Sequence, residues 1–187
     1  MTKKGSTLQG ALEDQVELLK GRIFEVVEII TDPQSSLVGI SGVKCTGAGD
    51  HVPKLDAKVI RLKELTRSVV SGLSFKIPEN LVQDLVSYAV NRMNTRKSGR
   101  SVSTEAPRVR FTGRKVNYKR KFTLSFGDYV ECYDPTSRGN TMKQRTNSCI
   151  ARYPSGNVSG SWYFLNLLTG LRVRHSRWIK WRTRRTS

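Results

Sequence analysis

Positive charge is distributed unevenly along this chain, and this distribution limits how the chain can fold and what it can bind. The 187 residues include 33 Lys and Arg against 15 Asp and Glu, which gives a net charge of +18 and a pI near 10.3. Residues 1–100 carry a net charge of +4 and residues 101–187 carry +14. We therefore expect two modules, a folded first half and a second half that binds an anionic polymer, for which nucleic acid is the usual candidate.

Composition and terminal sequence argue against several other classes of protein. No segment is apolar for the ~18 residues that a membrane span needs, and the amino-terminal residues lack the apolar core of a signal peptide. We therefore expect an intracellular protein, in the nucleus or the cytoplasm, with no membrane partner. Cys45, Cys132 and Cys149 form no CxxC pair, and His51 and His175 are the only histidines. A structural zinc site is not expected from this pattern.

The first module alternates helical and strand patterns. Residues 7–21 have apolar residues at helical spacing, and residues 22–31 are rich in Val and Ile, which is typical of a strand. One helix is predicted to begin near Pro53 and another spans 77–94, so residues 1–94 are expected to form an α/β domain. These two helices are expected to bury Leu55, Val59, Leu62, Val69, Leu73, Leu81, Leu85, Val86, Ala89, Val90 and Met93.

Asp32, which closes the predicted strand, has two interpretations. An Asp before a Pro commonly begins a turn and needs no function. Alternatively, an acid at the carboxyl end of a buried strand lies where open sheets place ligand or metal residues. On the helix that begins near Pro53, Asp56, Lys63 and Arg67 point within about 20° of one line. This line suits a metal-bound phosphate with a nucleic-acid backbone along the helix, and it equally suits an ordinary amphipathic helix whose dipole favours an acid in its first turn.

Residues 95–121 join the two modules and hold ten Lys and Arg against one acid, Glu105. Gly, Ser and Pro occur throughout, which favours an extended basic linker. The aromatic residues Phe111, Tyr118 and Phe122 suit contact with bases or sugars as well as packing.

The second module, residues 122–181, is predicted to be a small all-β barrel because short strands alternate with turn sequences. Trp162, Phe164 and Leu167 are expected in its core. Arginine is concentrated at the end of the chain without one acid, and a basic tail covers 182–187, which favours contact with phosphates. The residues expected to contact nucleic acid are Lys63, Arg67, Arg96, Lys97, Arg114, Lys115, Lys119, Arg120, Lys121, Arg172, Arg174, Arg177, Lys180 and Arg182.

Several long segments resemble the integrase region of copia-type retrotransposon polyproteins. The similar segments are "TDPQSSL", "GAGDHVPKLDAKVIRLKELTRSVVSG", "LVSYAVNRMN", "FTGRKVNYKRKFTLSFGDYVECYDP" and "ARYPSGNVSGSWYFLNLLTG", and they lie between about Leu18 and Trp178. The resemblance implies a ribonuclease H-like catalytic core with an Asp, Asp, Glu triad, followed by an SH3-like DNA-binding barrel. It implies that Asp32 is the second triad acid and that Asp56 stands where the family has its Glu.

The chain also departs from that family pattern. No acid among the 31 residues before Asp32 matches the first Asp of the triad, and Asp56 follows Asp32 by only 24 residues. Two carboxylates without the third should hold Mg²⁺ poorly. We therefore expect a truncated integrase remnant that binds DNA without sequence preference, needs no cofactor and is catalytically inactive alone. Two alternatives remain: a strand-transfer enzyme that uses Mg²⁺ and is completed by a homo-oligomer or another integrase chain, and an unrelated basic RNA-binding protein.

Overall fold

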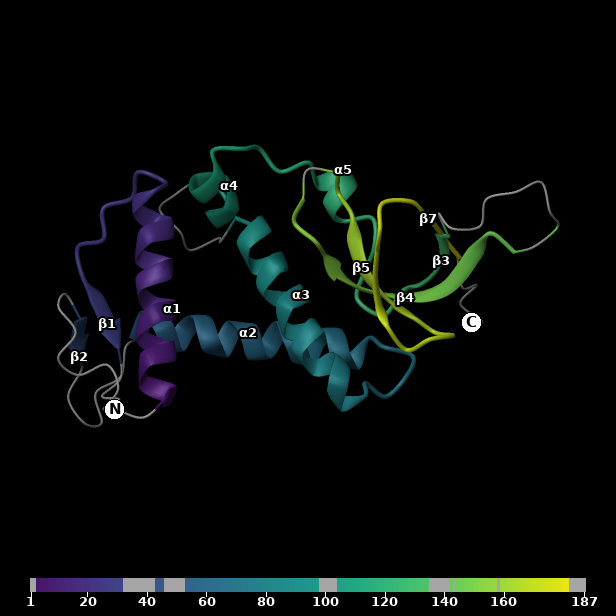
Figure 1. Cartoon of the computed structure of the whole chain (residues 1–187), viewed down its shortest axis with the longest axis horizontal. Coiled ribbons are helices and arrows are strands. Elements are labelled where there is room, and N and C mark those ends of the chain that lie inside the picture. Colours follow the sequence, from purple (N-terminus) through teal and green to yellow (C-terminus); the bar gives the residue numbers. More distant parts are fainter. Residues whose placement is uncertain are drawn as a thin grey trace. The chain divides into compact units, whose positions relative to one another are not determined.

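The chain is a mixed α/β protein that divides into two compact units, residues 1–61 and residues 62–187. A computed structural model describes residues 3–31, 43–45, 53–97, 104–134, 142, 144–157 and 159–181. Figure 1 shows helices along the first part of the chain and a group of strands in the last part. We call the two parts unit 1 and unit 2.

Unit 1 contains helix α1 (Lys3–Lys20), two short strands and the first turns of helix α2 (Pro53–Ser71). Strand β1 (Ile29–Thr31) pairs in parallel with β2 (Val43–Cys45), with Ile30 opposite Lys44. The predicted strand over 22–31 is therefore confirmed only for its last three residues. The first residues of the predicted strand are not extended, because Ile23 has a φ of 64°, which lies outside the β region. The side chain of Ile23 is also 98% exposed.

In the part of unit 2 that the structure describes, four helical segments follow α2 and accompany one antiparallel sheet. The helical segments after α2 are η1 (Glu79–Leu81), α3 (Val82–Thr95), α4 (Pro107–Thr112) and α5 (Tyr118–Lys121). The strands are β3 (Tyr129–Tyr133), β4 (Thr146–Pro154), β5 (Trp162–Asn166), β6 (Arg172–His175) and β7 (Trp178–Lys180).

The five strands of unit 2 lie in the order β6-β5-β4-β3-β7. Strands β3 to β6 follow one another as a meander, and β7 returns to pair with β3 on its other side. The described strands therefore form an open sheet, in which β6 and β7 are the edges and no hydrogen-bonded pairing closes a barrel. A β-bulge interrupts the pairing of β4 with β5 between Ala151 and Tyr153.

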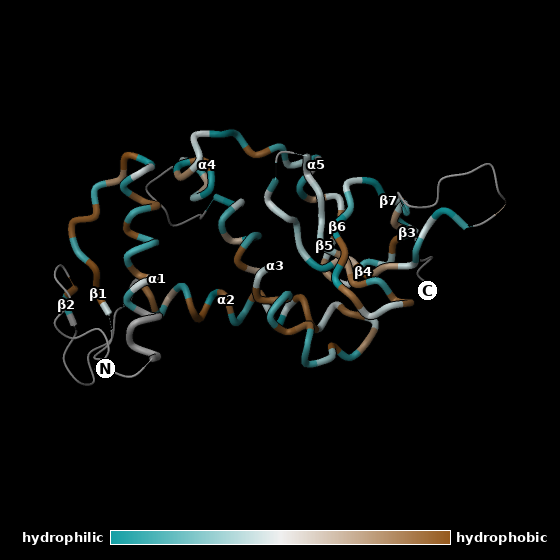
Figure 2. Tube along the Cα trace, in the orientation of Figure 1, coloured by the Kyte–Doolittle hydropathy of each residue, from teal (hydrophilic) through white to brown (hydrophobic). Residues whose placement is uncertain are grey.

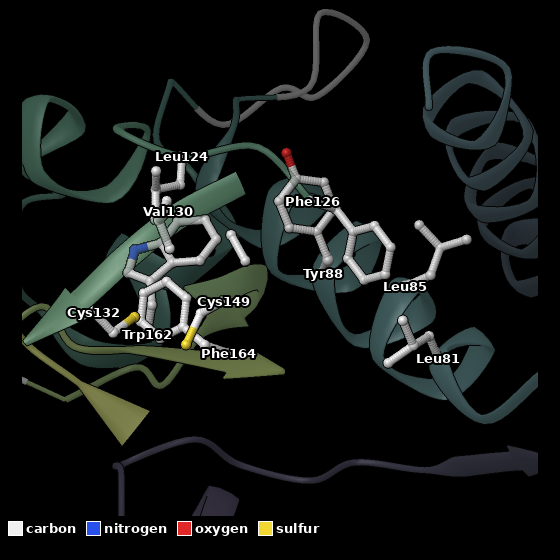
Figure 3. Packing of buried hydrophobic residues seen from close by; sticks show 11 residues of the cluster. Leu81, Leu85, Tyr88, Leu124, Phe126, Val130, Cys132, Cys149, Trp162 and Phe164 are labelled. Atoms are coloured by element: carbon white, nitrogen blue, oxygen red, sulfur yellow. The ribbon is translucent and has the colours of Figure 1, made fainter. Parts of the chain in front are cut away.

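The core of unit 2 lies between this sheet and helix α3. Figure 3 shows Tyr88 of α3 beside Phe126, with Trp162 and Phe164 of β5 in the same cluster. The ring of Tyr88 lies 5.9 Å from that of Phe126 and 6.4 Å from that of Trp162, in the tilted geometry that aromatic pairs prefer. The core side chains are Leu81, Leu85, Tyr88, Leu124, Phe126, Val130, Cys132, Cys149, Ala151, Trp162 and Phe164.

Gly127 permits the close approach of α2 to this core. Its φ is +86°, and a Cβ there would come within 2.5 Å of a methyl carbon of Leu73, just after α2. Its amide donates to the Ala151 carbonyl oxygen at 2.9 Å, which fixes the chain where it enters β3. Only glycine combines this conformation with this contact.

The observed division differs from the expected modules of 1–94 and 122–181. Helix α3 belongs to the core of the sheet, and the buried side chains of Asp84 in α3 and Arg152 in β4 form an ion pair, so residues 62–95 are part of unit 2. The expected extended linker over 95–121 instead contains α4 and α5. The boundaries differ because a helical apolar stripe shows that a helix is buried and does not show which sheet buries it.

Individual burial predictions are partly confirmed. Trp162 and Phe164 are buried as expected, whereas Leu167 is 47% exposed and the prediction for it is wrong. Along α2, where Figure 2 shows hydrophilic and hydrophobic residues in alternation, the exposed fraction is 48% for Leu55 and 38% for Val59, so the first half of the predicted stripe is exposed. Val86 and Val90 of α3 are also exposed.

Candidate nucleic-acid interface

All the net charge of the chain belongs to unit 2. Residues 1–61 contain eight Lys and Arg and eight Asp and Glu, whereas residues 62–187 contain 25 Lys and Arg against seven acids, a net charge of +18. This separation is sharper than the one expected from dividing the chain at residue 100. An anionic polymer would therefore be attracted to unit 2.

Tyrosine and arginine side chains gather on one face of the sheet of unit 2. Along β5, Trp162, Phe164 and Asn166 are buried, so Tyr163 and Leu165 point to the opposite face because side chains alternate along a strand. In the register of β5 with β6, Tyr163 lies opposite Arg174 and Leu165 lies opposite Arg172. Both arginines are exposed.

Tyr153 joins this group from β4. Its ring lies 5.0 Å from that of Tyr163, and its hydroxyl accepts a hydrogen bond of 3.3 Å from Nη1 of Arg172. The guanidinium carbon of Arg172 lies 5.0 Å from the centroid of the Tyr163 ring, within the range of a cation–π contact. We call Tyr153, Tyr163, Arg172 and Arg174 the arginine–tyrosine surface.

A buried ion pair adjoins this surface. The side chains of Arg152 and Asp84 are 11% and 7% exposed, and burial lowers the pKa of Arg152, while the nearby positive charge of Arg172 lowers it further against the opposing effect of Tyr153. Asp84 neutralises Arg152 of β4. The positive charges that this face of the sheet offers to a ligand are therefore those of Arg172 and Arg174 on β6. The ion pair also fixes β4 to α3 at the bulge that precedes Tyr153.

A second basic region lies where α3 meets α5. The guanidinium carbons of Arg92 and Arg96 lie 4.1 and 5.6 Å from the ring centroid of Phe122, and Nη2 of Arg92 donates to the Leu124 carbonyl oxygen at 2.8 Å. The hydroxyl of Tyr118 donates to the Thr95 carbonyl oxygen at 3.3 Å. The rings of Tyr118 and Phe122 lie 5.6 Å apart, so packing is confirmed for this pair, while contact of the 52% exposed Tyr118 with bases or sugars stays a prediction.

The structure distributes the other predicted contact residues over several elements. Seven of them have exposed side chains. They lie on α2, after α3, after α4, on α5 and before β7, and they are Lys63, Arg67, Lys97, Arg114, Lys115, Lys119 and Arg177. Lys180 forms an ion pair of 2.6 Å with Asp128, which reduces the charge that it offers to a phosphate. The side chain of Arg120 and all of Arg182 lie outside the described residues.

Tyr153 and Tyr163 are interface candidates that sequence reasoning missed. The alternation in "WYFLN" and "RVRH" places Tyr163, Arg172 and Arg174 on outward positions of their strands, and this signal is present in the sequence. Which outward residues meet across strands depends on the register, and the bulge after Ala151 changes that register before Tyr153.

The expected pair of metal-binding acids remains untested. Asp56 lies in the first turn of α2 with its side chain partly exposed, whereas Asp32 lies outside the described residues. Over the part of the chain that the structure describes, no three His, Cys, Asp or Glu side chains are grouped so that they could share a metal ion.

Comparison of the chain with known protein-family models and with curated protein sequences finds no match. Among the described residues, no helix is long and apolar enough to cross a membrane.

Proposed function

We propose that unit 2 binds DNA without sequence preference and that the chain is a remnant of a copia-type integrase. The observation that carries this proposal is the arginine–tyrosine surface on a unit that holds the whole net charge of +18. Arginine contacts phosphates through a planar fork of donors, which gives affinity without reading base edges. Tyrosine rings stack on any base, so the same surface accommodates single strands as well as duplex backbone.

The proposed fold of unit 2 is an SH3-like barrel. Its support is the strand order, in which a four-strand meander is completed by a last short strand that pairs with the first. For unit 1, we propose the back part of a ribonuclease H-like core. The support there is a parallel strand pair accompanied by helices, since parallel pairs belong to α/β domains.

A metal-dependent strand-transfer enzyme completed by another chain is the second candidate. The observation that favours it is the exposure of apolar residues in unit 1, where Ile23, Val27 and Ile30 are 98%, 84% and 46% exposed. Asp32 and Asp56 would then hold Mg²⁺ together with an acid from the other chain. The metal would supply Lewis-acid activation of a phosphate.

Binding of a labelled random DNA duplex, measured over a series of salt concentrations, tests the proposed function. Each phosphate contact contributes roughly −0.9 to the slope of log affinity against log salt, so five or more contacts would give a slope of about −4.5 or steeper. The double variant Arg172→Gln with Arg174→Gln should weaken binding roughly tenfold to a hundredfold, since each lost charged contact is worth about 1 kcal/mol or more.

Controls distinguish the proposed function from its alternatives. Lys44→Gln removes one positive charge from unit 1, where Lys44 is paired with Glu28, and should leave binding within about twofold. A flat salt dependence, or equal loss in Lys44→Gln and the double variant, would contradict the proposed interface. Tighter binding of structured RNA than of duplex DNA would favour the RNA-binding alternative, and joining of DNA ends in Mg²⁺ would favour the enzyme.

A further inference from the structure

On strands β3 and β4, two hydroxyl groups converge on one carboxylate. The hydroxyl of Tyr129 donates a hydrogen bond of 2.6 Å to Oε1 of Glu131 and lies 2.9 Å from Oγ of Ser148. Oγ of Ser148 donates to the same Oε1 atom at 3.0 Å. The strand register brings these groups together, because Glu131 of β3 lies directly opposite Ser148 of β4. We call Tyr129, Glu131 and Ser148 the hydroxyl–carboxylate cluster.

The hydroxyl–carboxylate cluster lies on the face of the sheet that points away from the core. Val130 and Cys132 of the same strand are 0% exposed and belong to the core. Successive side chains of a strand point to opposite faces, so Tyr129 and Glu131, which alternate with them, point outward. Tyr129 is 39% exposed, so its hydroxyl can contact a ligand.

The arginine–tyrosine surface shares this outward face. A row of directly opposite residues crosses four strands, from Tyr129 of β3 through Ile150 of β4 and Leu165 of β5 to Arg172 of β6. Residues that lie directly opposite each other in a sheet share one face. Three strand spacings, about 14 Å, separate the ends of the row, and a few nucleotides of a single strand cover that distance. One nucleic-acid strand can therefore reach both places.

The carboxylate of Glu131 fixes the direction of the hydroxyl protons. Its pKa is lowered, first by the hydrogen bond from Tyr129 and further by the hydroxyls of Ser148 and Thr146, against the opposing effect of burial. An ionised carboxylate only accepts hydrogen bonds, so the protons of Tyr129 and Ser148 are directed toward it. The hydroxyl oxygen of Tyr129 is then left to accept from a ligand. The cluster therefore presents acceptors and negative charge, which repel a phosphate and attract an N–H donor.

Nucleic-acid bases differ in the donors that they could offer to this cluster. Cytosine carries an amino group where uracil and thymine carry a carbonyl oxygen. In a duplex this edge is engaged with the partner base, whereas in a single strand it is open to a protein. A basic peptide would also offer N–H donors, but the net charge of +18 on unit 2 would repel it.

We propose that the hydroxyl–carboxylate cluster is a base-recognition site that favours bases with an amino group in single-stranded DNA. The amino group donates to the hydroxyl oxygen of Tyr129, while phosphates of the same strand contact Arg172 and Arg174. Glu131 is a positioning residue, because it acts by orienting the hydroxyl of Tyr129. The site deepens the proposed function, on which it rests for DNA as the ligand, and adds a base preference that is confined to single strands.

Fluorescence anisotropy with labelled single strands of about ten nucleotides, at a slightly alkaline pH that keeps cytosine unprotonated, tests the site. The wild type should bind oligodeoxycytidine roughly tenfold more tightly than oligodeoxyuridine, which lacks the amino group. Tyr129→Phe keeps the ring and removes the hydroxyl, so it should bring this ratio down to about twofold or less without weakening the binding of oligodeoxyuridine. Tyr133→Phe makes the same chemical change on the same strand, outside the cluster, and should keep the ratio.

Glu131→Gln separates base recognition from general electrostatics. The substitution removes a negative charge from a unit of net charge +18, so electrostatics alone would leave every strand bound equally or more tightly. At the proposed site, the new amide can donate as well as accept, so it no longer fixes the proton of Tyr129. The affinity for oligodeoxycytidine should therefore fall several-fold while that for oligodeoxyuridine stays the same or rises. Loss of folding would weaken both and cannot produce this result.

Equal affinity of the wild type for the two strands, or an unchanged ratio in Tyr129→Phe or Glu131→Gln, would overturn the base-recognition site. In each case, salt-dependent binding of a duplex would leave the proposed function standing. A preference for oligodeoxycytidine in a chain that failed to bind duplex DNA would support the site and contradict the proposed duplex contacts. Binding of a basic peptide that Glu131→Gln abolishes would assign the cluster to a protein partner and overturn the site.

Discussion

The two units of this chain differ in charge and in burial. Unit 2 carries a net charge of +18 around a core in which Val130, Cys149 and Phe164 are 0% exposed. Unit 1 carries no net charge, and none of its described side chains is buried. A domain that must hold many like charges together needs a core to offset their repulsion, and unit 2 has one. The described residues of unit 1 form the elements of an α/β domain without the burial that normally stabilises a parallel sheet.

The largest difference between the two units is expected in their cooperativity of unfolding when each is expressed separately. Residues 62–187 should unfold cooperatively as an isolated fragment because every described buried residue lies within it. Residues 1–61 should show no cooperative transition, since the described elements of this range bury no side chain that could offset chain entropy. Far-ultraviolet circular dichroism during urea unfolding measures both.

A third fragment tests the revised boundary. Residues 122–181 lack Leu81, Leu85 and Tyr88 of the core, and they leave Arg152 without Asp84, so we expect this fragment not to fold. Cooperative unfolding of 122–181 alone would restore the boundary expected from the sequence. Cooperative unfolding of 1–61 would remove the contrast between the units.

The sequence allowed prediction of most elements and of the aromatic centre of the core. The start of α2 at Pro53, the strands of unit 2 and the burial of Trp162 and Phe164 follow from local signals, namely a first-turn proline, period-two alternation and apolar volume. Leu167 was misassigned because Oδ1 of Asn166 accepts from the amides of Leu168 and Thr169, which begins a turn and ends the strand before Leu167.

The candidate site was predictable only in part, because it depends on register. Arg172 and Arg174 are expected from the sequence to bind phosphate, but the contacts of Arg172 with Tyr153 and Tyr163, and the position of Arg174 opposite Tyr163, arise across three strands and a bulge. The hydrogen bond from Arg108 to the Gly156 carbonyl oxygen is less predictable still, because the two residues are 48 positions apart in the sequence. Pairings at such separations follow from tertiary packing rather than from local pattern.

The second-largest difference between the units is expected in the free energy of unfolding that is lost when one ion pair in each unit is broken. Asp84→Ala leaves the buried Arg152 without its partner and should cost about 3–5 kcal/mol. Glu28→Ala breaks the ion pair with Lys44, in which the side chain of Lys44 is 75% exposed and that of Glu28 is 43% exposed. This change should cost less than about 1 kcal/mol of stability. Urea unfolding followed by tryptophan fluorescence reports unit 2, which holds all 3 tryptophans, and circular dichroism includes the helices of unit 1. A loss in Asp84→Ala no larger than in Glu28→Ala would show that this ion pair is not buried.

Matched valine truncations should give the smallest difference and compare the two units most directly. Val130→Ala removes two carbon groups from a side chain that is 0% exposed, so it should cost roughly 2 kcal/mol from lost burial and the cavity left behind. Val27→Ala makes the same chemical change where the side chain is 84% exposed, and its effect should stay within about 0.5 kcal/mol. The same urea experiment measures both free energies of unfolding, and dilution of the protein provides the control. If Val27→Ala costs as much as Val130→Ala, and the cost disappears on dilution, then the apolar residues of unit 1 are buried by another chain, as the enzyme alternative requires.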